Sequence, residues 1–172
     1  MTTTGRSGYP DLANHRASLY AQAMTVWRPS NRIRVIAIGL HWRGRSLLAA
    51  EVLNDAGQLK GVRPLGGAIE FGETWQQALA REFREELQVG IIVTGAPSVM
   101  ENIYHHEGSV GHEVVFAATI EFADGTYDDR DEIVFAEDDG VQQRAGWFDF
   151  DDLDAGGPRL FPTGLKAVVQ GD

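Results

Sequence analysis

The feature that most limits how this chain can fold is a helical pattern that runs from Thr74 to Gln88. Thr74 is followed three residues later by Gln77, and this spacing is that of a capping box, which predicts where the helix begins. Apolar residues recur at the period of a helix that buries one face, and they are Leu79, Ala80, Phe83 and Leu87. We expect Gly90 to end the helix, because glycine is common just beyond a helix C-terminus.

Three glutamates form a second stripe on this predicted helix. Glu82, Glu85 and Glu86 are spaced i, i+3 and i+4, so they fall within an arc of roughly 100° beside the apolar face. Like charges at this spacing destabilise a helix, and a divalent cation would remove the repulsion. Carboxylate oxygens suit Mg²⁺ or Mn²⁺. The helix alone fits equally well a solvated acidic face, in which Arg81 pairs with Glu85 at i+4.

The segment before the helix favours a metal site over a solvated acidic face, because the segment is rich in glycine. Gly66 and Gly67 let the backbone approach a ligand more closely than a side chain would permit, and Gly72 allows a sharp turn into the helix. A carbonyl-rich loop and Glu73 are therefore expected near the acidic face of the helix. A loop and a helix arranged in this way can hold metal ions from both sides.

The segment from Gly67 to Val89 resembles the Nudix box. That box has a glycine, five residues, a glutamate, seven residues, Arg-Glu, two residues and a Glu-Glu pair. The matching residues are Gly67, Glu73, Arg81, Glu82, Glu85 and Glu86. One position of the box departs, since Gln88 stands where the box has its last glycine, and we expect Gly90 to take over its role. Just before the box, Leu65 stands where many members have proline, which is a change of packing.

The resemblance implies an α/β/α sandwich around a mixed β-sheet. It also implies hydrolysis of a phosphoanhydride bond in a nucleoside diphosphate linked to another moiety, such as a nucleotide sugar, a dinucleotide or a nucleoside triphosphate. With Mg²⁺ or Mn²⁺ as the cofactor, the implied metal ligands are Glu82, Glu85, Glu86 and the carbonyl of Gly66. The implied catalytic residues are Glu73, Arg81, Glu85 and Glu86. Arg81 would orient a ligand carboxylate, and Glu73 would support the loop and the helix.

The general base of the reaction stays open at this point. It lies either inside the box, at Glu85 or Glu86, or in a later segment. The later candidates are Glu113, Glu132 and Glu137, and a surface or structural role is the ordinary alternative for each of them.

Arg63 and Tyr104 are the candidate substrate-binding residues. Arg63 stands just before the double glycine, where it could meet a phosphate, and Tyr104 could stack on a base. Sheet packing and solvated charge are the plainer explanations of both residues. Tyr104 also stands about fifteen residues beyond the box, where members that prefer ADP-ribose often carry proline, so the resemblance disfavours that substrate.

Outside the helix, the hydrophobic pattern predicts a strand-rich chain. Strands are expected at residues 32–42, 46–53, 62–65, 91–93, 99–105, 112–122 and 146–150, with another around Ile133 in the acidic stretch 124–139. A closing helix is expected at residues 162–169. Residues 1–30 are predicted to be an N-terminal extension in which Asp11 caps a short helix, and residues 31–172 to be the Nudix domain.

The composition excludes several classes of function. A net charge of −10 disfavours binding to DNA or RNA polymers. The chain has no cysteine, which excludes thiol catalysis and, with it, the isopentenyl diphosphate isomerases that share the Nudix fold. No apolar run is long enough for a membrane span, and the N-terminus lacks the apolar core of a signal peptide, so a cytoplasmic protein is predicted.

The expected partner is a small nucleotide-derived diphosphate, and a homodimer is a further option. The main alternative function is a non-catalytic Nudix-fold module that senses a nucleotide derivative. Such modules usually lose acidic positions of the box, and this chain keeps them.

Overall fold

The computed structural model describes residues 27–123, 126–127, 129–136 and 140–171. The helix predicted after Asp11 lies outside the described residues, and so does Glu137. Within the described residues, no helix is both long enough and apolar enough to cross a membrane.

The first of two sheets is mixed and has the strand order β5-β1-β8-β6, with β7 also paired to β8. Its strands are β1 (Ile33–Leu40), β5 (Gly66–Ala68), β6 (Ile91–Val93), β7 (Ser98–His106) and β8 (Ser109–Phe122). β1 and β8 run parallel, while the other pairs are antiparallel. Among the described residues, β5 is paired only to β1, so it lies at the edge of this sheet.

The second sheet is antiparallel throughout and has the order β2-β3-β10-β9, with β4 also paired to β3. Its strands are β2 (Trp42–Arg43), β3 (Ser46–Leu53), β4 (Leu59–Arg63), β9 (Glu132–Ala136) and β10 (Gln142–Asp149). The chain passes from this sheet into the first one between β4 and β5. That passage carries the double glycine to the edge of the mixed sheet.

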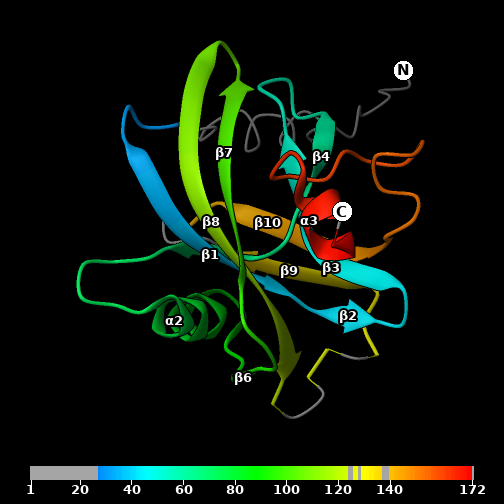
Figure 1. Cartoon of the computed structure of the whole chain (residues 1–172). Coiled ribbons are helices and arrows are strands. Elements are labelled where there is room, and N and C mark those ends of the chain that lie inside the picture. Colours follow the sequence, from blue (N-terminus) through cyan, green and yellow to red (C-terminus); the bar gives the residue numbers. More distant parts are fainter. Residues whose placement is uncertain (1–26, 124–125, 128, 137–139, 172) are drawn as a thin grey trace, which may run out of the picture.

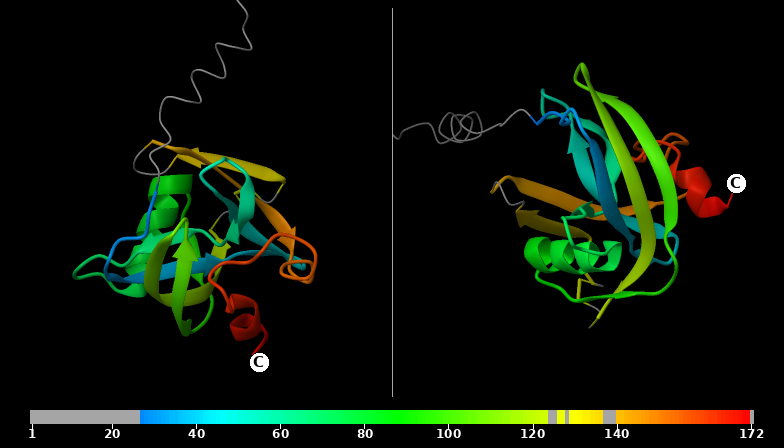
Figure 2. Two further views of the ribbon diagram at one scale, coloured as in Figure 1. Left: turned by 90° about the horizontal axis from the view of Figure 1, so that it is seen from above. Right: turned by 60° about the vertical axis from the view of Figure 1, so that its left-hand side comes forward.

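Two helices lie on opposite sides of the mixed sheet, as Figures 1 and 2 show. On one side, α2 (Trp75–Leu87) buries Ala78, Leu79, Phe83 and Leu87 in a core that also contains Ala37 and Ile120. On the other side, α3 (Leu165–Gln170) buries Leu165 in a second core with Ile36, Ile38 and Val115. Successive side chains of β1 point to opposite faces of the sheet, so they contribute alternately to these two cores. The predicted α/β/α arrangement around a mixed sheet is confirmed.

The predicted strand at residues 32–42 was too long at its C-terminal end. β1 ends at Leu40, and the chain turns at His41 into β2 of the other sheet. The His41 ring is buried, with Nδ1 3.1 Å from the carbonyl oxygen of Ile120, and the His41 carbonyl accepts a hydrogen bond from Leu48. The sequence of a continuous apolar run does not reveal such a change of sheet, because the residues before and after the turn are both apolar.

The helix predicted from Thr74 to Gln88 is confirmed at its N-terminus. The Thr74 side chain accepts a hydrogen bond from the Gln77 backbone, and the Gln77 side chain accepts one from the Thr74 backbone. At the C-terminus, the expected role of Gly90 was wrong. Gln88 itself adopts the left-handed conformation, with φ of 57° and ψ of 32°, and caps the helix through its backbone N–H.

The remaining elements are present with shifted bounds. The strand predicted at residues 62–65 is β4, which ends earlier, at Arg63, and Gly66 and Gly67 belong to the strand β5 instead of a loop. The strand predicted around Ile133 is β9, and the closing helix is α3. The division into two sheets was not predicted, because alternation within one strand does not identify its neighbours.

Phe83 lies at the centre of the core beneath α2 and is 1% exposed. We expect Phe83→Ala to lower the free energy of unfolding by about 3–5 kcal/mol, because it removes buried apolar surface and leaves a cavity. Phe71, which is fully exposed, provides the control, and Phe71→Ala should change the value by less than about 0.5 kcal/mol. Denaturant unfolding measures both. Equal losses in the two variants would contradict the described core.

Gln88 holds a backbone conformation that costs an L-residue roughly 1 kcal/mol and costs glycine little. We therefore expect Gln88→Gly to raise the free energy of unfolding by about 0.5–1 kcal/mol. Gln76→Gly, at an exposed position inside the same helix, should lower it by about 1 kcal/mol. Thermal or denaturant unfolding of the two variants measures both changes. A loss of stability in Gln88→Gly would show that Gln88 does not have the left-handed conformation.

Candidate metal and phosphate site

The edge strand β5 and the helix α2 touch where Gly67 meets Glu82. A Cβ atom placed on Gly67 would overlap the Glu82 carboxylate, so only glycine lets that carboxylate lie against the strand backbone. Gly66 has a φ of +135°, and a Cβ atom there would overlap the Ala37 carbonyl of β1. The double glycine therefore brings the β5 backbone and an acidic side chain of α2 into direct contact.

Arg81 connects the acidic residues of this site. Its Nε donates to Oε1 of Glu73 at 2.9 Å, and its Nη1 donates to Oε1 of Glu82 at 2.8 Å and to Oε2 of Glu85 at 3.2 Å. Its Nη2 donates to the Ala68 carbonyl at 2.9 Å, which joins the helix to β5. Hydrogen bonds to Glu73 and the other carboxylates raise the pKa of Arg81 above its ordinary value. Arg81 therefore stays charged and holds the acidic stripe against the edge strand.

Glu73 ties the loop before α2 to the same network. Hydrogen bonds from Arg81 and from the Glu70 backbone, which donates to Oε2 at 3.1 Å, hold the pKa of Glu73 below its ordinary value. These hydrogen bonds therefore favour the ionised form of Glu73. Ion pairs join Arg81 to Glu73 and to Glu85, the i+4 partner, while the supporting role of Glu73 stays a prediction.

The charge of the site is strongly negative. Glu73, Glu82, Glu85 and Glu86 bring four carboxylates to one helix stripe and its preceding loop, and Arg81 supplies one positive charge to this group. Glu82 keeps only 15% of its side chain exposed, so water screens its charge poorly. Such a set of oxygen ligands fits Mg²⁺ or Mn²⁺. In the described residues, however, no three acidic or histidine side chains already converge on one point.

A cavity of about 380 Å³ adjoins the last turn of α2. Glu85 and Glu86 line it from the helix, while Tyr127 and the end of β9 at Ala136 line it from the other side. The hydroxyl of Tyr127 donates to the Leu87 carbonyl at 3.1 Å and so holds this wall against the helix. Glu137 follows Ala136 directly in the sequence.

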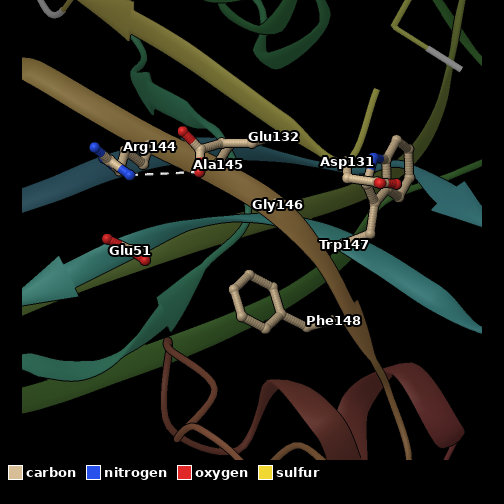
Figure 3. A pocket seen from close by; sticks show the side chains of 8 residues that line it. All are labelled: Glu51, Asp131, Glu132, Arg144, Ala145, Gly146, Trp147 and Phe148. Carbon is tan, nitrogen blue, oxygen red and sulfur yellow. Dashed lines mark hydrogen bonds and ion pairs between the residues drawn. The ribbon is translucent and has the colours of Figure 1, made fainter. Parts of the chain in front are cut away.

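The structure places Glu132 away from α2. Figure 3 shows its side chain beside Arg144, and the two form an exposed ion pair of 3.4 Å. Both line a separate cavity of about 230 Å³ on the second sheet, together with Glu51 and Phe148. Glu132 is therefore not brought together with the glutamates of α2.

Glu113 is also separated from the helix, because its side chain points to the opposite face of the mixed sheet. On β8 it alternates with residues of the core beneath α2 and lies in register with Arg34 of β1. It is 4% exposed and lies near Arg34, whose Nη1 is 3.7 Å from its Oε1. Asn102 of β7 donates to its Oε2 at 3.5 Å.

Tyr104, one of the two candidate substrate-binding residues, lies close to Glu113. Burial and the nearby Glu113 carboxylate raise the pKa of Tyr104, and the charge of Arg63 acts on the same hydroxyl. The sequence did not indicate Arg34 and Asn102, the other members of this cluster. Their roles depend on strand register, and a single sequence carries no signal of register across strands that are distant in the chain.

The fold and the site together define an α+β protein with an acidic helix set against a glycine-bearing edge strand. The chain belongs to the Nudix family, because the profile of the NUDIX domain matches residues 31–166. Members of this family hydrolyse nucleoside diphosphate derivatives and generally use divalent metal cations. The comparison with curated proteins found no match.

Two solved structures illustrate the shared fold. The solution structure of the E. coli ORF135 protein is 20% identical over 81% of this chain and 90% of that one, with a TM-score of 0.52. A NUDIX hydrolase from Nitrosomonas europaea is 17% identical over 81% of this chain and 87% of that one, with a TM-score of 0.50. At these identities the likeness concerns the fold.

The lowered pKa of Glu73 predicts a pH-dependent contribution to stability. Because the folded-state pKa lies below the ordinary value of 4.5, the contribution is present near neutral pH and is lost as the pH falls through the folded-state pKa. Glu73→Gln should therefore be less stable than the unmodified chain at about pH 7, and the gap should shrink below about pH 4.5. Denaturant unfolding at several pH values measures the gap. A difference in stability that stays constant across this pH range would contradict the hydrogen-bond network of Glu73. Glu70→Gln, at an exposed position, serves as the control.

Proposed function

We propose that this chain hydrolyses a phosphoanhydride bond in a nucleoside diphosphate linked to another moiety, with Mg²⁺ or Mn²⁺ as the cofactor. The observation that carries the proposal is the contact between Gly67 and the Glu82 carboxylate, with Glu85 and Glu86 on the same stripe of α2. In this proposal, the oxygen ligands come from the backbone of the edge strand and from the side chains of the helix. A diphosphate is rich in negative charge, so the carboxylates would repel it. It needs a site that can hold a cation if it is to bind near them.

Each residue of the acidic stripe has a distinct part in this proposal. The side chains of Glu82, Glu85 and Glu86, with the carbonyl of Gly66, would hold the divalent cation. Held there, the cation would supply charge neutralisation for the phosphate oxygens and a water molecule of lowered pKa. Arg81 orients Glu82 and Glu85 through the contacts of 2.8 and 3.2 Å, and Glu73 keeps Arg81 in place.

A carboxylate of the chain accepts the proton of the attacking water. We assign this role to Glu85 or Glu86, which line the cavity beside α2, or to Glu137, which follows the cavity residue Ala136 in sequence. Glu113 faces the other side of the mixed sheet, and Glu132 pairs with Arg144 at another cavity. Both positions argue against a role as the base.

The remaining parts of the proposal concern the substrate and the setting. Arg63 and Tyr104 contact the part of the substrate beyond the diphosphate. A net charge of −10 argues for a small substrate and against a nucleic acid polymer. A cytoplasmic location remains the prediction, and a homodimer remains an option. A non-catalytic sensor is less well supported, because every acidic position of the box is filled.

Glu86→Gln should lower the rate of hydrolysis by several orders of magnitude while leaving the fold intact. The change removes one negative charge and one oxygen ligand without a change of size, so the loss reports on chemistry at the site. The measurement is release of phosphate or nucleotide from a panel of nucleotide sugars, dinucleotides and nucleoside triphosphates, with Mg²⁺ and then Mn²⁺. Thermal unfolding confirms that the variant is folded.

The matched control is Glu121→Gln, on the exposed surface of β8 and away from α2. It should retain the rate of the unmodified chain. Near-normal turnover by Glu86→Gln would refute the assignment of that side chain. No turnover of any substrate by the folded, unmodified chain would favour the sensor.

A further inference from the structure

An apolar surface lies on the α2 side of the mixed sheet, where the helix does not cover it. Figure 1 shows that the hairpin of β7 and β8 extends beyond α2. Five large apolar side chains from three neighbouring strands are exposed on this part of the sheet. We call them the hairpin face, and they are Ile33 and Val35 of β1, Val110 of β8, and Val99 and Ile103 of β7.

Strand register places the hairpin face on one side of the sheet. Ile103 of β7 and Ile33 of β1 both pair with His112 of β8, so these three residues form a row across the sheet. Val35 and then Ala37 follow on the same face of β1, and Ala37 belongs to the core beneath α2. The other members lie an even number of residues from this row along their strands. The hairpin face therefore continues the core beneath α2 into solvent.

The exposure of the hairpin face is large for apolar side chains that lie together. Four of its five residues are between 54% and 62% exposed, and Val35 is 39% exposed. Exposed apolar residues that stand singly are common, whereas a contiguous apolar patch marks a contact surface. Covering the patch would release the water that contacts it, which is favourable.

The charge of the hairpin face differs from that of the chain as a whole. Between the apolar residues, the same face carries Glu101, His105 and His112, and Nε2 of His112 lies 2.8 Å from Oε1 of Glu101. The whole chain has a net charge of −10. Two copies that meet through this face therefore do not bring their excess negative charge together.

The size of the hairpin face fits a contact between two copies of the chain. The exposed fractions of its five residues correspond to roughly 500 Å², which is in the range of the largest apolar patches on single chains. Two copies would cover roughly 1,000 Å² of such surface, and the polar side chains around it bring the total to about 1,200 Å², the size of a small specific interface.

We propose that this chain forms a two-fold symmetric dimer in which the hairpin faces of two copies pack against each other. A symmetric pair uses the same surface twice, so one apolar patch on each copy is enough to complete the contact. Two sheets that pack face to face interdigitate the side chains of their inner faces, and the alternating residues of β7 and β8 supply such side chains. The inference does not depend on the proposed hydrolysis.

Sedimentation velocity of the full chain over a range of concentrations tests the dimer. The unmodified chain should pass from monomer to dimer with a dissociation constant in about the micromolar range, because the interface is small. Ile103→Glu places a like charge on both copies and should raise this constant at least about 10-fold. The control is Val134→Glu, because Val134 is 55% exposed but lies on β9 of the second sheet. Thermal unfolding verifies that both variants are folded.

A single cysteine reports on the hairpin face directly, since the chain has none of its own. The thiol of Ile103→Cys should react several-fold more slowly with a maleimide in the dimer than in the monomer. The thiol of Val134→Cys should react at the same rate in both.

Three results would each overturn the inference. They are a chain that stays monomeric at every concentration, a dimer that survives Ile103→Glu unweakened, and an Ile103→Cys thiol that is already protected in the monomer. The last result would mean that the chain covers this face itself. Because no turnover is measured, these outcomes are distinct from failure of the proposed hydrolysis, which the Glu86 experiment tests.

Discussion

The contact between the Gly67 backbone and the Glu82 carboxylate is the constraint on which the rest of the site depends. It requires glycine at the edge of the mixed sheet, since a single Cβ atom would fill the space. It also requires α2 to be fixed in position relative to β5. The buried side chains of Leu79 and Phe83 fix the helix in this way. The core beneath α2 thus sets the position of the acidic stripe, and the stripe needs no flexible loop to reach the strand.

Bringing four carboxylates together costs free energy unless positive charge balances them. Arg81 supplies part of that charge and connects Glu73, Glu82 and Glu85 to the Ala68 carbonyl. The remaining negative charge is what makes the site suited to a divalent cation. The same feature would let a strongly acidic protein act on an anionic substrate, with a bound cation between the two.

The sequence predicted α2, its capping box and the acidic stripe well, because helical spacing and capping are local. It predicted the helix end less well. Gln88 occupies a left-handed position that usually requires glycine, and nothing local distinguishes it from Gly90. The double glycine indicated a close approach, but the paired strand β5 depends on β1, which is distant in sequence. Glu113 illustrates the same limit, since the face of β8 on which it lies is set by tertiary packing.

The most direct test of this account is a crystal structure of the protein grown with Mn²⁺, examined by anomalous scattering. The account predicts an ion beside the Gly66 carbonyl, coordinated by side chains from Glu82, Glu85 and Glu86. A structure of the folded protein in which these side chains point apart, with no ion between them at saturating Mn²⁺, would contradict it.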